Sequence, residues 1–92
     1  MAEARVKKSH TLGLAGVRER AKTAEKDLAE RYSAQTSWKD ENTLNFARAG
    51  YKGYISLREL EVEFYVDLGF IGGLLKGKVE TKATEILDRY FS

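Results

Sequence analysis

Few side chains in this sequence are of the types that carry out covalent or metal chemistry. His10 is the only histidine, and the chain has no cysteine. A multi-histidine metal site, a cysteine-ligated zinc and a Cys/His dyad are therefore excluded within one chain. A Ser-His-Asp triad would have to use His10, and no serine stands in a nucleophile elbow. We expect His10 to end a strand and begin a helix, and we expect no enzymatic activity, metal or cofactor.

The run Gly72–Val79 matches the G-x-x-x-x-G-K spacing of a phosphate-binding loop, with Lys78 as its lysine. Two features oppose that interpretation. Val79 replaces the Ser or Thr that binds Mg²⁺, and the strand pattern before the motif predicts antiparallel neighbours rather than a βαβ unit. We therefore expect no nucleotide binding, and we interpret Gly72 and Gly73 as a flexible start to the last helix.

Three carboxylates, Glu61, Glu63 and Asp67, fall on one face of a predicted strand. Paired carboxylates can bind a cation or act as acid and base. The solvated face of an antiparallel sheet produces the same pattern without any catalytic role. The solvated face is the interpretation that we prefer.

Aromatic and basic residues are interleaved in the predicted strands, as in a stacking platform for single-stranded nucleic acid. The residues concerned are Trp38, Arg48, Lys52, Tyr54 and Tyr65. Strand propensity alone favours aromatic residues at such positions, and the aromatic motif of RNA-recognition domains is absent. A net charge of +2 is also too small to indicate a nucleic-acid partner. We therefore do not expect one.

The helices that would position these residues follow from hydrophobic periodicity. Apolar residues recur every three or four positions over Leu14–Tyr32, which predicts an amphipathic helix. Ser9 or Thr11 can supply the N-cap hydroxyl, and Asp27 and Arg31 form a favourable pair near the end. A second amphipathic helix follows the glycines, with its apolar stripe at Leu75, Val79, Ala83, Ile86, Leu87 and Tyr90.

Five segments have the composition or alternation of strands: Ala4–Lys8, Ala34–Lys39, Thr43–Arg48, Tyr51–Leu57 and Leu60–Leu68. The last is the clearest, because every second residue from its start is apolar and the others are mostly charged. One face should therefore be buried, with Phe64 between the helices, and the other face should be wet.

Each helix has one apolar stripe and the sheet has one apolar face, which predicts an α+β two-layer sandwich. The expected order is β-α-β-β-β-β-α, an antiparallel meander with both helices packed on one face. The 92 residues fit a single domain, 1–92. No stretch approaches the roughly 20 apolar residues of a membrane span. No apolar segment follows the basic start, so we expect a cytoplasmic protein that is not integral to a membrane.

The segment Phe70–Leu75 has more apolar residues than one helix stripe can bury. Leu74 points away from the predicted stripe. An exposed apolar patch marks a partner, a membrane-like surface or a dimer contact, although a connector tucked over the sheet end is an equal alternative. We predict partner contacts, including a homodimer, at Phe70, Ile71, Leu74 and Lys78.

An ordered set of residues resembles the bacterial polyhydroxyalkanoic acid system family, small proteins whose genes are associated with polyhydroxyalkanoate synthesis or storage granules. The set comprises His10–Gly13, Trp38, Leu44–Gly50 and the most specific block, Asp67–Glu80. The similarity covers nearly the whole chain and implies no catalytic residues. The last strand, glycine break and final helix also resemble a reduced START-type helix-grip domain, an analogy of fold alone.

The resemblance implies a non-enzymatic accessory protein of polyhydroxyalkanoate metabolism, acting at the granule surface or on granule proteins. The apolar surplus lies beside Lys76, Lys78 and Lys82, which could face water while the surface rests on a hydrophobic polymer. The chain lacks the long, Ala-rich helical composition of a phasin, so we do not expect it to be the main granule coat.

The alternative function is a small carrier that holds a hydrophobic acyl ligand between helix and sheet. A carrier needs a pocket of about 300 Å³ or more at that place. A core filled by large apolar side chains would oppose it, the residues concerned being Phe46, Ile55, Phe64, Val79 and Ile86.

Overall fold

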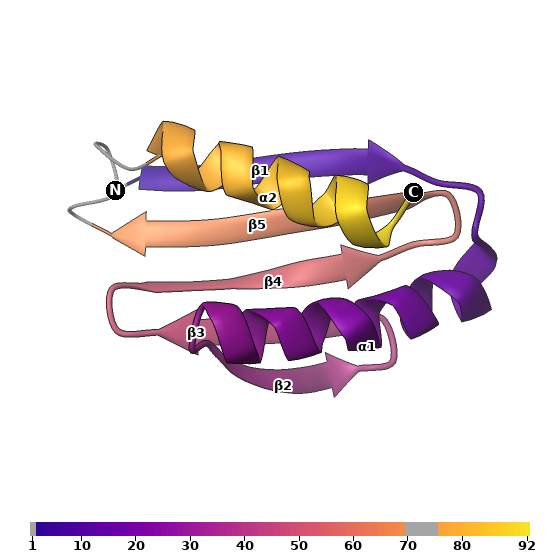
Figure 1. The fold of residues 1–92 in the computed structure, drawn as a ribbon, viewed down its shortest axis with the longest axis horizontal. Coiled ribbons are helices and arrows are strands. Elements are labelled where there is room, and N and C mark those ends of the chain that lie inside the picture. The colour runs from indigo at the N-terminus through magenta and orange to yellow at the C-terminus, as the bar shows by residue number, and fades with distance from the viewer. Residues whose placement is uncertain (1, 70–75) are drawn as a thin grey trace.

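The computed structural model describes residues 2–69 and 76–92 (Figure 1). Five strands form one antiparallel open sheet in the order β1-β5-β4-β3-β2, and two helices lie on one face of it. The elements are β1 (Ala2–Ser9), α1 (Gly13–Arg31), β2 (Gln35–Asp40), β3 (Thr43–Arg48), β4 (Tyr51–Leu57), β5 (Glu61–Gly69) and α2 (Lys76–Tyr90). The predicted α+β class, element order and two-layer arrangement are confirmed.

Both helices are amphipathic, as their periodicity predicts. The buried stripe of α1 is Val17, Ala21, Ala24 and Leu28. That of α2 is Ala83, Ile86 and Leu87. The predicted ion pair near the end of α1 is present, with 2.9 Å between Arg31 Nε and Asp27 Oδ1. Within the described residues, no helix is long and apolar enough to cross a membrane.

The core lies between the helices and the apolar face of the sheet. Phe64 is only 5% exposed there, and its ring centroid lies 5.1 Å from that of Phe46. Phe91 is fully buried although it follows the end of α2. Phe91 was not predicted as a core residue because the expected helical stripe ended at Tyr90, yet its spacing of four from Leu87 places it on the same stripe. Its N–H still donates to the carbonyl of Leu87, at 2.9 Å.

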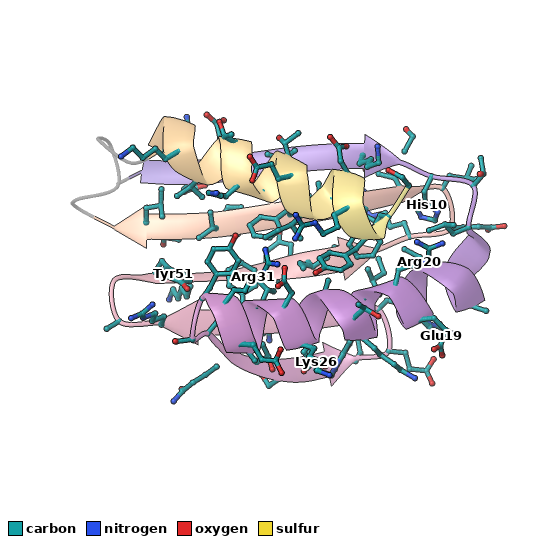
Figure 2. All side chains as sticks on the ribbon, viewed as in Figure 1. His10, Glu19, Arg20, Lys26, Arg31 and Tyr51 are labelled. Atoms are coloured by element: carbon teal, nitrogen blue, oxygen red, sulfur yellow. The ribbon has the colours of Figure 1, made fainter. Side chains whose placement is uncertain are left out.

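His10 fastens the connection between β1 and α1 to the turn between β4 and β5 (Figure 2). Its Nδ1 accepts a hydrogen bond from the N–H of Leu12 at 3.1 Å. The ring proton therefore sits on Nε2, which donates to the carbonyl oxygen of Arg58 at 2.8 Å. His10 thus lies at the predicted junction, whereas the predicted N-cap hydroxyls of Ser9 and Thr11 are wrong. The N-cap is Leu12, which makes no side-chain cap bond, and the imidazole binds its N–H instead.

We expect His10→Ala to lower the free energy of unfolding by about 1–3 kcal/mol, because it leaves two backbone groups without their partners. Urea denaturation measures the loss. Thr11→Ala is the control, since Thr11 is an exposed neighbour and its change should cost under about 0.5 kcal/mol. A loss in His10→Ala no larger than that of the control would contradict the fastening role.

Leu60 was expected to begin the last strand on its buried apolar face, and this expectation is wrong. Leu60 is 69% exposed and does not belong to the buried apolar face. β5 begins one residue later, at Glu61, and Leu60 lies in the turn, where its carbonyl accepts the N–H of His10 at 2.9 Å.

β4 passes very close to its neighbours at Gly53. This residue stands between Phe46 on β3 and Val66 on β5. A Cβ atom placed on Gly53 would overlap the carbonyl oxygen of Tyr65 and lie 2.8 Å from Phe46 Cζ. The absence of a side chain therefore lets β3, β4 and β5 meet here.

Candidate functional site

An apolar groove lies between α1 and α2, over the helix-covered face of the sheet. The two helices converge toward the C-terminal end of α2 and diverge toward its N-terminal end (Figure 1). The groove occupies the divergent end and has a volume of about 210 Å³. Its floor is formed by Phe46, Phe64 and Val66, and its walls include Leu28 of α1 with Val79 and Ile86 of α2.

Helical spacing explains the two walls. On α2, Val79, Ala83 and Ile86 recur at intervals of four and three, so they share one face and turn toward the groove. On α1, Leu28 and Tyr32 are four residues apart and form the opposite wall. The walls are therefore the ends of the same apolar stripes that hold the helices on the sheet.

Two lysines of α2 line the groove on its exposed side. Lys78 and Lys82 are one turn apart, and both are exposed to solvent. Lys82 Nζ lies 3.5 Å from Glu85 Oε2, an exposed pair that contributes little stability. Among the lining residues that the structure describes there is no Asp or Glu. The groove is thus apolar inside and cationic at its edge.

Two half-buried tyrosines, Tyr32 and Tyr51, also line the groove. The guanidinium of Arg48 donates to the carbonyl oxygen of Tyr32 at 3.0 Å. Burial raises the pKa of Tyr51 above its ordinary value of 10.0, although the charge of Arg48 opposes the shift. The Tyr51 hydroxyl therefore stays protonated at neutral pH and can donate a hydrogen bond.

Comparison with protein families gives a match over residues 4–91 to the family described as "Putative polyhydroxyalkanoic acid system protein". The chain belongs to this family. The resemblance inferred from the sequence is thereby confirmed over almost all of its length. Comparison with curated proteins gave no match, and neither did comparison with solved structures.

Of the four contact residues predicted for this polyhydroxyalkanoic acid system protein, Lys78 lies in the described part, where it lines the groove. Phe70, Ile71 and Leu74 lie outside the described residues, as do Gly72 and Gly73. The contacts predicted for that segment, including the homodimer, stay predictions.

The structural context of the phosphate-loop motif agrees with the argument made against it. β5 is antiparallel to both of its neighbours, β1 and β4. A phosphate-binding loop instead follows a strand of a parallel βαβ unit. Lys78, the third residue of α2, does lie at the start of a helix, so the features that oppose the motif are the antiparallel strand and Val79.

The three predicted carboxylates lie on the helix-free face of the sheet and are engaged by neighbours. Glu63 is only 4% exposed, so the predicted solvated face is wrong at this position. The reason is that Arg5 and Arg58 lie against its carboxylate, at 3.4 and 3.6 Å. Arg58 also pairs with Glu61 at 3.1 Å, and Asp67 accepts a backbone N–H two residues further on.

The aromatic residues that were considered as a stacking platform are divided between the two faces of the sheet. Tyr54 and Tyr65 stack on the helix-free face with 5.0 Å between ring centroids, and the guanidinium of Arg5 lies 5.1 Å from the Tyr65 ring. Trp38 instead stands opposite Leu44 on the helix-covered face and donates from Nε1 to Glu25 of α1 at 3.1 Å. A single aromatic surface is therefore not formed.

Tyr32 and Tyr51 were not predicted as site residues. A signal for them does exist, because Tyr32 ends the apolar stripe of α1 and Tyr51 begins β4 on its apolar face. An aromatic residue with a polar tip at the end of an apolar stripe suits the edge of a groove, where one end is buried and the other is wet.

Proposed function

We propose that this chain is a non-enzymatic accessory protein of polyhydroxyalkanoate metabolism that acts in the cytoplasm, at the granule surface or on granule proteins. The observation that carries the proposal is membership of the family over residues 4–91. The groove supports it, since an apolar hollow edged by lysines suits contact with a hydrophobic polymer or an apolar segment of a granule protein.

A second candidate is the small carrier of a hydrophobic acyl ligand, and the observation that favours it is the apolar lining of the groove. Of the five side chains whose packing would oppose a carrier, four are buried in the core, and four also line the groove; the buried ones are Phe46, Ile55, Phe64 and Ile86, and the lining ones are Phe46, Phe64, Val79 and Ile86. The groove volume of about 210 Å³ is below the roughly 300 Å³ of common ligand pockets. The groove is therefore smaller than the pocket expected for a carrier, and it would limit the ligand to an acyl chain of medium length or shorter.

We expect Val79→Lys to weaken co-sedimentation with washed polyhydroxyalkanoate granules about tenfold, because it places an ammonium group against the apolar groove. Thr81→Lys is the matched control. It adds the same charge to the same helix at an exposed position that does not line the groove. Circular dichroism of both variants checks that each is folded.

Comparing sedimentation with native granules and with granules stripped of protein distinguishes contact with the polymer surface from contact with granule proteins. Binding to both indicates contact with the polymer surface, and binding to native granules alone indicates contact with granule proteins. Failure of the unchanged protein to sediment with either would contradict the proposed function. Equal sedimentation of the Val79→Lys and Thr81→Lys variants would show that the groove is not the contact.

A further inference from the structure

The size of the groove limits the ligand that it can enclose. An apolar cavity of about 150 Å³ in a protein core takes up benzene, a molecule of six carbons. A groove of about 210 Å³ therefore holds about eight carbons in similar contact. Its interior is formed by side chains such as Phe46, Phe64 and Ile86, which offer no hydrogen-bonding group. The enclosed part of a ligand must then be apolar and of medium length.

The charge at the edge of the groove determines which head group suits the ligand, at the end that is not enclosed. Lys78 and Lys82 stand together on one face of α2, and the described lining residues include no carboxylate. The six residues between Gly69 and Lys76 carry no charge in the sequence either. The partner of Lys82, Glu85, lies outside the groove in an exposed pair at 3.5 Å, and a ligand carboxylate can replace it. The hydroxyl of Tyr51 adds a protonated donor. An anionic head group would engage the two ammonium groups more strongly than a neutral one, because hydrogen bonds between two charged groups are the stronger ones.

We propose that the groove binds a medium-chain fatty carboxylate, with its hydrocarbon tail over Phe64 and its carboxylate between Lys78 and Lys82. This inference rests on the carrier as the protein's function and names the ligand class that the carrier takes. Contacts between the hydrocarbon tail and the apolar groove supply most of the affinity. The two lysines select an anionic head group over a neutral one.

The test compares two probes of equal chain length, sodium octanoate and 1-octanol, by calorimetry or by titration of amide NMR signals. We expect octanoate to bind about five- to tenfold more tightly, since two partly exposed lysines face its carboxylate. In the double variant Lys78→Gln/Lys82→Gln, octanoate should bind no better than octanol, while the affinity for octanol should not change.

A matched double variant separates local charge from net charge. Lys22→Gln/Lys26→Gln removes the same two charges from exposed positions of α1 that do not line the groove, and Figure 2 places Lys26 on the side of α1 away from α2. It should keep the preference for octanoate. Val79→Phe fills the groove from an incompletely buried position, so it should weaken the binding of both probes.

The possible results distinguish failure of the proposed anion preference from failure of the carrier function and of the granule role. Equal binding of octanoate and octanol that Val79→Phe abolishes would overturn the selection of an anion and leave an acyl carrier in place. No binding of either probe by a protein that still sediments with granules would overturn both the inference and the carrier, and would leave the granule role. Loss of the preference in the Lys22→Gln/Lys26→Gln variant would overturn the assignment to Lys78 and Lys82.

Discussion

Phe64→Ala is expected to lower the free energy of unfolding by about 3–5 kcal/mol, which is a large part of the stability of a domain this small. Phe64 lies on β5 between Val6 on one side and Ile55 on the other, and the helices cover it. Truncation would remove its contact with the Phe46 ring and leave a cavity continuous with the groove. The surrounding strands cannot close that space, because their backbones are hydrogen-bonded in register.

Urea denaturation of the two proteins measures this loss. Phe64→Leu keeps most of the volume and serves as the control, with an expected cost below about 1.5 kcal/mol. If Phe64→Ala cost less than about 1 kcal/mol, the assignment of the sheet faces would be wrong.

Gly53→Ala is expected to cost about 3 kcal/mol or more, although it adds a single methyl group. The new Cβ would overlap the carbonyl oxygen of Tyr65 and lie 2.9 Å from Val66 Cα. Both are backbone atoms of β5, so no change of side-chain rotamer can relieve the clash. β4 and β5 would have to separate at the centre of the sheet.

Thermal unfolding followed by circular dichroism tests this expectation against Gly77→Ala. Gly77 is exposed in α2, and a Cβ there meets nothing within 4 Å. Alanine should therefore leave the protein as stable or raise its stability by up to about 1 kcal/mol. A Gly53→Ala variant as stable as the unchanged protein would contradict the close approach of the strands.

Local patterns were sufficient to predict most of the elements. β3 and β4 were predicted over Thr43–Arg48 and Tyr51–Leu57, the bounds that the structure shows, because turn residues separate them. The alternation of β5 assigned Phe64 to the buried face correctly. The pairing of β1 with β5 could not be predicted, since a short strand carries no signal for a partner so far along the chain.

The site was less predictable because it depends on distances between elements. Apolar stripes show which faces of α1 and α2 are buried, but not how far apart the helices lie, and that separation makes the groove. The register of β2 against β3 decides that Trp38 faces α1 rather than joining Tyr54. The burial of Glu63 likewise depends on Arg58, which reaches it from the turn before β5.

The place of β1 in the sheet has a consequence for how the protein acquires its structure. β1 is synthesised before the other described elements, yet its only partner strand in the described part of the chain is β5. During translation, β1 therefore leaves the ribosome long before it can be paired, and α2, which covers it, is synthesised later still. Pairings between segments far apart in sequence also slow the folding of a finished chain. The sheet is thus completed only after β5, the last of its strands in the described part of the chain, has been made.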